Sequence, residues 1–299
     1  MSKTLQPDSG EPKVRSATKQ KAVAFLREAG IVIGAFLVLN NFVIASFLVP
    51  TGSMENEVMT GDLLFVNKFI YGGTSPRNIP FTDVRLPWFR VPGIRDVERG
   101  DVIVFVFPGN RDVVAPDEFT FYLKRCVGLP GDTIQVIDRV LFVNGEPFPI
   151  PRNLKFSYHR VRRGPEEGIF PPGAPWNEDN YGPLAVPKKG MVIPLDPGTV
   201  GAWETFILRE GHDVRIAGGS VLLDGVATTE YVVERDYLFG MGDHRDNSLD
   251  SRYWGFIPRE NLVGTPMIVY WSWDTNIPIY DIFSKLGSVR WGRLGTLIK

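Results

Sequence analysis

The stretch MGDHRDNSLDSRYWG occupies residues 241–255 and is the most informative segment of the chain. Within it, carboxylates, arginines and hydroxyls alternate between apolar flanks. A solvated loop with local Asx turns would have a similar composition. The density of opposite charges and hydroxyls favours a hydrogen-bonded scaffold instead.

A second segment, YLKRCVGLPGD at residues 122–132, reads as a strand that enters a turn rich in Gly and Pro. Alternation along a strand places Lys124 on one face with Tyr122 and Cys126. A lysine that faces inward among apolar neighbours is costly unless it is neutral or paired. The alternative is a solvent-facing lysine that protects a sheet edge from aggregation.

A third segment, PTGSM at residues 50–54, directly follows a long apolar run. Taken alone, Ser53 would be an ordinary loop serine. Taken together, the three segments resemble the serine, lysine and Gly-Asp boxes of the type I signal peptidases, in that family's order. Gly61-Asp62 and residues 99–102 (RGDV) are similar to two further boxes of the family.

The resemblance covers residues 30–137 and 235–299, and residues 138–234 resemble the variable cap of longer bacterial members. It implies a mainly β protein with a core of coiled antiparallel sheets, an inserted β-rich cap and one N-terminal transmembrane helix. The implied division has four parts. Residues 1–29 form a cytoplasmic segment and residues 30–49 a transmembrane helix. Residues 50–137 and 235–299 together form the catalytic core, and residues 138–234 form the cap.

In this family the serine of the first box is the nucleophile and the lysine of the second box is its general base, which points to Ser53 and Lys124. A serine hydroxyl reacts poorly until a base removes its proton. Lysine can be that base only when neutral, so burial must lower its pKa from an ordinary value of about 10.4. Pairing of serine with lysine is a known variant of serine-protease chemistry.

Four further roles follow from the resemblance. Ser248 would orient the lysine. Thr51 would supply its hydroxyl to the oxyanion hole together with the backbone N–H of the nucleophile. Asp250 and Arg252 would form a structural ion pair.

The implied reaction is endoproteolysis of exported preproteins at the signal-peptide junction, with small side chains at the first and third positions before the cut. The substrate would bind extended, by adding a strand to a sheet edge. The implied partners are preproteins, the lipid bilayer and the secretion translocon, with no metal and no organic cofactor. By match to the family, the substrate pocket would be lined by Phe47, Val49, Met54, Val58, Tyr122 and Leu123.

The chain departs from the family pattern at two places. Residues 55–58 (ENEV) follow the serine box where the family usually has x-Pro-Thr-Leu. Glu55 and Glu57 would either alter the entrance to the site or face lipid headgroups and water, and the sequence leaves both open. His244 stands where the family usually has Asn, and we interpret it as a partly exposed substitution rather than as part of a Ser-His pair.

The apolar run from Gly30 to Val49 carries no charge and would span about 30 Å as a helix, the thickness of a bilayer's hydrocarbon core. Lysines and arginines precede it, so the positive-inside rule places the N-terminus in the cytoplasm and the rest of the chain outside the cell membrane. Residues 1–21 are polar and are expected to be disordered. Two alternatives are a cleaved secretory signal, with Val43-Ile44-Ala45 at its cleavage site, and a buried helix of a soluble protein.

The rest of the chain has the composition of a loop-rich β protein, with 31 Gly and 24 Pro. Asn144-Gly145 and Asp224-Gly225 are hairpin turn signals. Residues 146–200 are rich in Pro, Gly and charge and are expected to have little regular structure. Strands are expected at residues 63–66, 102–107, 133–137, 140–143, 221–223 and 267–271.

A formal net charge of −1 gives no indication of a nucleic-acid partner. The single cysteine, Cys126, excludes an intramolecular disulfide and is expected to be inert. Two other classes fit the same residues. One is a self-cleaving repressor-type Ser-Lys protease, which would carry a DNA-binding domain where this chain has its apolar run. The other is an inactive membrane-tethered β scaffold that binds peptides, which would not need Ser53, Lys124, Thr51 and Ser248.

Overall fold

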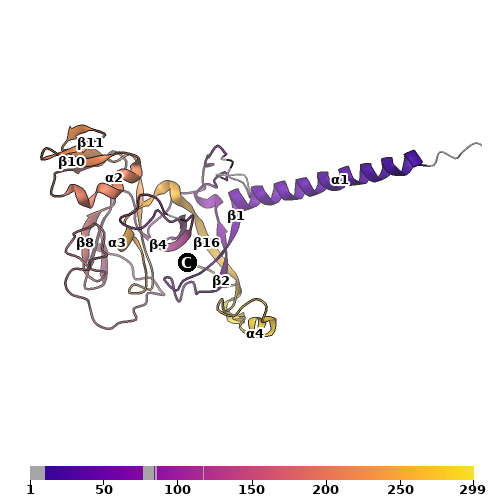
Figure 1. Cartoon of the computed structure of the whole chain (residues 1–299). Coiled ribbons are helices and arrows are strands. Elements are labelled where there is room, and N and C mark those ends of the chain that lie inside the picture. Colours follow the sequence, from indigo (N-terminus) through magenta and orange to yellow (C-terminus); the bar gives the residue numbers. More distant parts are fainter. Residues whose placement is uncertain (1–10, 77–83, 85, 117) are drawn as a thin grey trace, which may run out of the picture.

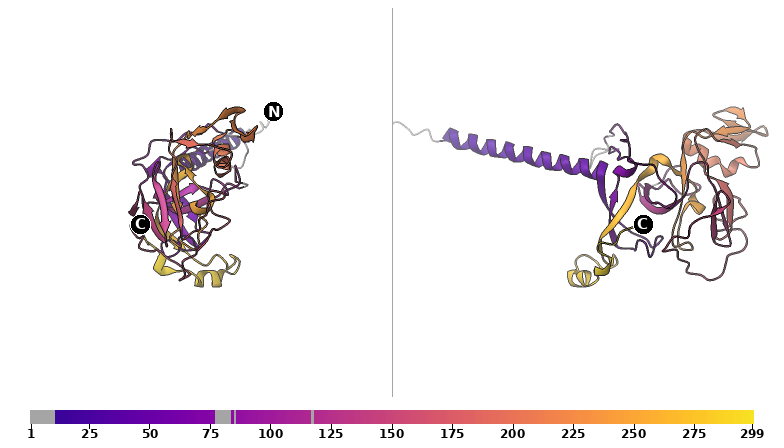
Figure 2. Two further views of the ribbon diagram at one scale, coloured as in Figure 1. Left: turned by 90° about the vertical axis from the view of Figure 1, so that its left-hand side faces the viewer. Right: turned by 180° about the vertical axis from the view of Figure 1, so that it is seen from behind.

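The protein is described from a computed structural model, in which residues 11–76, 84, 86–116 and 118–299 are described. A long N-terminal helix, α1, projects from one side of a β-rich body (Figure 1). The view from behind shows the same projection, with the cap strands at the far end of the body from the helix (Figure 2, right). The chain is therefore mainly β with one N-terminal apolar helix, as the sequence predicts.

Helix α1 runs from Glu11 to Val38 and continues as a π-helical turn, η1, from Leu39 to Val43. The prediction of disorder is therefore wrong for residues 11–21, and residues 1–10 lie outside the described residues. Residues 13–21 contain Ala, Lys and Gln but no Gly or Pro. Such residues extend an existing helix at little cost, because only nucleation is unfavourable.

The prediction that the apolar helix continues to Val49 is also wrong, because Ile44–Leu48 forms strand β1. This strand pairs antiparallel with β2 (Asp62–Asn67), residue for residue. Branched and aromatic side chains such as Ile44 and Phe47 suit a strand as well as a membrane helix. The helical stretch long and apolar enough to cross a membrane is therefore Gln20–Val43 rather than residues 30–49.

The main sheet has seven strands in the order β1-β2-β16-β3-β4-β14-β15, and all its pairings are antiparallel. Strand β16 is long, with two register shifts against β2. Such bulges increase the local twist of a sheet. The remaining strands of this sheet are β3 (Val102–Val106), β4 (Phe121–Gly128), β14 (Tyr237–Met241), β15 (Ile257–Pro258) and β16 (Leu262–Ser272).

The inserted region forms three smaller antiparallel sheets, with the orders β7-β6-β5-β8, β10-β11-β12 and β13-β9. The sheet pairing assigns β5 to the four-stranded sheet of the cap, because it bonds with β6 and β8. We therefore propose that the cap begins at Thr133 rather than at residue 138. The strands are β5 (Thr133–Ile137), β6 (Val140–Val143), β7 (Glu146–Pro147), β8 (Tyr181–Ala185), β9 (Val192–Pro194), β10 (Val214–Ala217), β11 (Ser220–Leu223), β12 (Val226–Thr228) and β13 (Glu230–Val232).

Both predicted hairpin turns are confirmed. Asn144 and Gly145, between β6 and β7, have φ values of 56° and 82°. Asp224 and Gly225, between β11 and β12, have φ values of 50° and 82°. Two successive positive φ values are those of a type I′ turn, which Asn-Gly and Asp-Gly favour. All six predicted strands are present, with bounds that differ by a few residues.

Short helices connect these strands, and three apolar clusters form the core. One cluster lies under the loop between β1 and β2, where Leu64, Val66, Val104 and Val269 are among its members. A second packs around Trp254 and Phe105, and the largest joins β14 to the cap sheets. The helices are η2 (Phe69–Tyr71), η3 (Val200–Ala202), α2 (Glu204–Glu210), α3 (Ser251–Trp254), η4 (Arg259–Asn261), α4 (Ile282–Gly287) and η5 (Trp291–Arg293).

Candidate active site

Ser53 lies in the turn-rich loop that connects β1 to β2. The Val49 N–H donates a hydrogen bond of 2.9 Å to the carbonyl of Asp62 and closes the base of this loop. Met54 and Val58 are fully buried and pack on the apolar cluster beneath it. Because the loop is anchored directly after Ser53, the serine side chain has little freedom, and it is 8% exposed.

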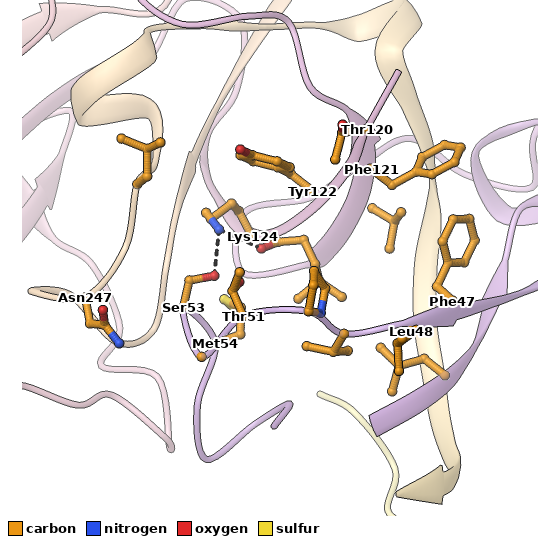
Figure 3. Close-up of a pocket in the computed structure, with 17 residues that line it drawn as sticks. Phe47, Leu48, Thr51, Ser53, Met54, Thr120, Phe121, Tyr122, Lys124 and Asn247 are labelled. Carbon is orange, nitrogen blue, oxygen red and sulfur yellow. Dashed lines mark hydrogen bonds between the residues drawn. The ribbon is translucent and has the colours of Figure 1, made fainter. Parts of the chain in front are cut away.

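Lys124 lies on β4, between β3 and β14 in the main sheet, and is 4% exposed. Its Nζ donates a hydrogen bond of 2.7 Å to Ser53 Oγ and one of 3.1 Å to the carbonyl of Leu123. The amine and the hydroxyl point toward each other (Figure 3). A buried position on an inner strand excludes the alternative of a solvent-facing edge lysine.

Burial lowers the pKa of Lys124 from its ordinary value of 10.5 to about 8. The main cause is loss of hydration of the ammonium group. Asp250 and Asp243 act in the opposite direction, while Arg252 lowers the pKa further. A base with this pKa is neutral in a useful fraction of molecules at neutral to mildly alkaline pH.

Residues 241–255 form a buried hydrogen-bonded scaffold. Asp250 and Arg252 make the ion pair that the sequence predicts, at 2.8 Å. The Asp250 carboxylate also accepts the Gly242 N–H at 3.0 Å. Arg252 donates to the carbonyl of Glu178 at 3.0 Å, so the scaffold is joined to the cap.

The same segment holds the strand of the lysine and the loop of the serine. Arg125 lies next to Lys124 and pairs with Asp243, with 2.8 Å between its Nε and Oδ1. The backbone N–H of His244 donates to the carbonyl of Ser53 at 3.1 Å. Removing this segment would therefore release both members of the pair.

Ser248 lies beside the serine loop but does not bond to Lys124. Its buried hydroxyl has no hydrogen-bond partner among the described residues. A Cβ at Gly242 would lie 2.2 Å from Ser248 Oγ and 2.6 Å from the carbonyl oxygen of Ser53. Only glycine at position 242 permits this approach, and the orienting role of Ser248 stays a prediction.

Thr51 stands two residues before Ser53 on the same turn (Figure 3). Within the described ranges, neither its hydroxyl nor the backbone N–H of Ser53 has a hydrogen-bond partner in the protein. Two donors are therefore free next to the Ser53 hydroxyl.

A cavity of about 340 Å³ opens beside the pair, between β1 and β4. Its wall includes five of the six residues predicted to bind substrate: Phe47, Val49, Met54, Tyr122 and Leu123. Val58 is the exception, because it is fully buried under the loop and supports Met54 and Val49 from below.

Sequence reasoning missed part of the cavity wall. Leu48 and Phe121 lie on β1 and β4, next to residues that were predicted to line the pocket. Asn247 and Leu249 come from the scaffold segment, where the sequence carries no periodic signal. The additional lining residues are Leu48, Pro50, Gly52, Leu64, Val104, Thr120, Phe121, Asn247 and Leu249.

The interpretation of His244 as partly exposed is wrong, because the residue is 3% exposed. The cap covers it, and Ser157 Oγ lies 2.6 Å from its Nε2. Glu55 forms an ion pair with Lys155 at 2.8 Å, and buried Glu57 accepts the Lys299 N–H at 2.7 Å. Neither glutamate lines the cavity. Glu57 is buried, while Glu55 is partly exposed and paired with the cap.

A sequence profile of the family described as "Signal peptidase, peptidase S26" matches residues 22–271 of this chain. A signal peptidase I of Pseudomonas fluorescens is 30% identical over 273 residues, which cover 85% of this chain and 74% of that protein. A signal peptidase I of Rickettsia bellii is 28% identical over 304 residues, which cover 98% of this chain and 90% of that protein. A crystal structure of a signal peptidase I from Enterococcus faecalis is 21% identical and covers 58% of this chain and 98% of that one, with a TM-score of 0.28, too low to carry an argument.

Proposed function

Because this chain belongs to the signal peptidase family, peptidase S26, and is therefore a serine endopeptidase, we propose that it removes signal peptides from exported preproteins with Ser53 and Lys124 as a catalytic pair. The observation that carries this proposal is the buried hydrogen bond of 2.7 Å between Lys124 Nζ and Ser53 Oγ. This hydrogen bond joins a nucleophile to a lysine that is removed from water. Only such a lysine is neutral often enough to accept the serine proton.

In the first step, the neutral amine of Lys124 takes the proton of Ser53 while Oγ attacks the carbonyl carbon of the scissile bond. A tetrahedral intermediate forms, and its negative oxygen needs hydrogen-bond donors. The free N–H of Ser53 and the hydroxyl of Thr51 are the donors that we assign to it. Both lie on the turn that carries the nucleophile.

In the second step, the ammonium of Lys124 gives its proton to the leaving amine, and an acyl-enzyme on Ser53 remains. Water then attacks the ester, with Lys124 again as the base. The cycle ends with free Ser53 and two peptides.

The position of the cavity supports an extended substrate. Strand β1 is an edge of the main sheet and contributes Phe47 and Leu48 to the cavity, while β4 contributes Tyr122 and Leu123 on the opposite side. A preprotein segment lying between them would place alternate side chains on this apolar wall. Small residues before the cut are expected, because the wall lies directly beside Ser53.

Cleavage of a preprotein should rise with pH, because only the neutral form of Lys124 accepts a proton. With a pKa of about 8, kcat should increase about tenfold per pH unit below this value and level off above it. The experiment follows preprotein cleavage from pH 5 to pH 10 and sequences the N-terminus of the product. Cleavage away from the signal-peptide junction would contradict the function, and a rate maximum in acid would contradict a lysine base.

We further propose that helix α1 anchors the enzyme in the cell membrane. Among the described residues, one helix, Gln20–Val43, is long and apolar enough to cross a bilayer, and its apolar window is not buried. Its 24 residues would span about 36 Å. The exposure disfavours a soluble core helix, and signal cleavage after Ala45 would divide strand β1. The cations on the N-terminal side of the apolar stretch favour a cytoplasmic N-terminus and a catalytic body outside.

Exposed aromatic side chains in the C-terminal region support a second contact with the membrane. Phe283 on α4 is 90% exposed and Tyr280 is 85% exposed, and Trp291 is also exposed. The basic residues of this region are already engaged in the protein. Lys285 bonds to backbone carbonyls, and Arg293 pairs with Asp62. The contact that we propose is therefore apolar and aromatic rather than electrostatic.

A truncated enzyme that begins at Ile44 should keep its chemistry on short peptides, because β1 stays in the sheet. It should still bind liposomes through the exposed aromatic residues and cleave preproteins faster in the presence of lipid or detergent. A form that begins at Val49 is the matched control, and it should lose activity because β1 lines the cavity. If the Ile44 form ignored liposomes and cleaved preproteins as fast as the full-length enzyme, the surface contact would be disproved.

A further inference from the structure

The cap segment of residues 153–158 lies against the scaffold of residues 241–255. The Lys155 N–H donates to the carbonyl of Asp243 at 2.9 Å, and the Arg245 N–H donates to the carbonyl of Lys155 at 3.0 Å. The carboxylate of Asp246 accepts the N–H of Ser157 at 2.7 and 2.8 Å. The segment is thus attached by main-chain bonds to the part of the chain that contacts the serine loop.

Glu55 connects the serine loop to this cap segment. It lies two residues after Ser53, and its Oε2 is 2.8 Å from Lys155 Nζ and 3.2 Å from His244 Nδ1. The hydrogen bond from Lys155 is the main reason that the pKa of Glu55 lies below its ordinary value. Both side chains of the ion pair are about one-third exposed, so the pair can be altered without opening the core.

His244 is the second connection. Its backbone N–H donates to the carbonyl of Ser53 at 3.1 Å, while its ring lies between Glu55 and Ser157. Its Nδ1 faces Glu55, and its Nε2 faces the Ser157 hydroxyl and, at 3.5 Å, the Asp246 carboxylate. One buried residue therefore joins the nucleophile's own carbonyl to the cap.

Glu57 holds the far side of the loop to the same cap segment. Its carboxylate accepts from the side-chain amide of Asn153 and from the N–H of Lys299. The two glutamates that flank Asn56 thus contact residues 153 and 155 of the cap.

We propose that residues 153–157 act as a positioning clamp on the nucleophile loop, through the Glu55–Lys155 pair and His244. The clamp keeps Ser53 Oγ within hydrogen-bond reach of Lys124. The inference rests on the proposed Ser53–Lys124 chemistry and assigns the cap a part in it. None of the clamp residues touches the reacting atoms, so they are positioning residues. Loops are the most mobile parts of a fold, and a misplacement of about 1 Å in an active site costs about 100-fold in rate.

The test uses the full-length enzyme in detergent and compares Glu55→Gln, Lys155→Met and the double variant, with kcat and KM measured on a short peptide above pH 8. Each single change should lower kcat about tenfold, as expected for partial release of the loop, and leave KM within about twofold. The double variant should be no slower than the slower single variant, because both changes open one contact. Lys155→Arg should restore most of the rate, since it keeps the charge.

A matched control is the exposed cap ion pair Asp138–Arg163, at 2.7 Å, which has no contact with the serine loop. Asp138→Asn and Arg163→Met should leave kcat unchanged. If Glu55→Gln and Lys155→Met kept normal kcat while Ser53→Ala was inactive, the clamp would be disproved and the catalytic pair would stand. Normal turnover by Ser53→Ala would overturn both.

Discussion

The Ser53→Ala and Lys124→Ala enzymes should each cleave preproteins at least about 10⁴-fold more slowly than the wild-type enzyme. Ser53→Ala removes the atom that we propose forms the acyl-enzyme. Lys124→Ala removes the group that lies 2.7 Å from Ser53 Oγ and leaves a neutral hydroxyl with no base. Because the two residues act as one unit, the double variant should be no slower than the slower single one. Single-turnover cleavage of a preprotein measures all three.

Loss of folding does not explain the expected loss of activity. Burial lowers the pKa of Lys124 from 10.5 to about 8. Below pH 8, this shift lowers the free energy of unfolding by up to about 3 kcal/mol. This cost falls as the pH rises from 8 to 10.5, where the unfolded chain also loses the proton. Lys124→Met removes the charge but keeps the length of the side chain. Its free energy of unfolding at pH 7 should therefore not be lower than that of the wild-type enzyme.

Substantial turnover by the Lys124→Ala enzyme would contradict the lysine base. His244 would then be the next candidate, because its main chain already contacts Ser53. The present geometry disfavours it, since the imidazole is engaged with Glu55 and Ser157. A His244→Asn enzyme separates the two cases: it keeps the backbone donor and should retain the alkaline rise of the pH profile.

The pairing of Ser53 with Lys124 could not be derived from spacing, because the two residues are 71 positions apart. Strand alternation placed Lys124 on one face with Tyr122 and Cys126 but left open whether that face is buried. The resemblance to a family indicated both its burial and its partner. The ion pair of Asp250 and Arg252 was likewise implied by the resemblance, and the structure contains it. Short-range patterns and a family resemblance thus identified the serine, the lysine and the ion pair of the candidate site.

The sequence misplaced the end of the apolar helix, and the reason is physical. An uncharged apolar run meets the requirements of a membrane helix and of an edge strand equally well, and only the partner strand decides between them. For Ile44–Leu48 that partner is β2, which follows after the serine loop. A local pattern does not contain this pairing.

The contacts of Glu55, Glu57 and His244 were unpredictable for a different reason. Each of the three contacts a residue of the segment 153–157, which lies within a Pro- and Gly-rich region that has no periodicity. The set of motifs that identifies the family does not account for them either, because these three residues depart from its pattern. For residues outside the family pattern, the three-dimensional contacts therefore give information about their role that the sequence does not.

Thr51→Val should lower kcat by about 10²- to 10³-fold, the usual cost of one oxyanion donor. Valine has the shape of threonine but cannot donate a hydrogen bond. The substitution should not affect folding, because Thr51 is exposed and its hydroxyl has no partner in the described part of the protein. Thr51→Ser keeps the hydroxyl and should remain active, which makes it the matched control. KM should change little in either variant, because the hydroxyl is needed only when charge develops on the substrate oxygen. Normal turnover by Thr51→Val would contradict this role, and the oxyanion would then be stabilised by the Ser53 N–H and a donor other than Thr51.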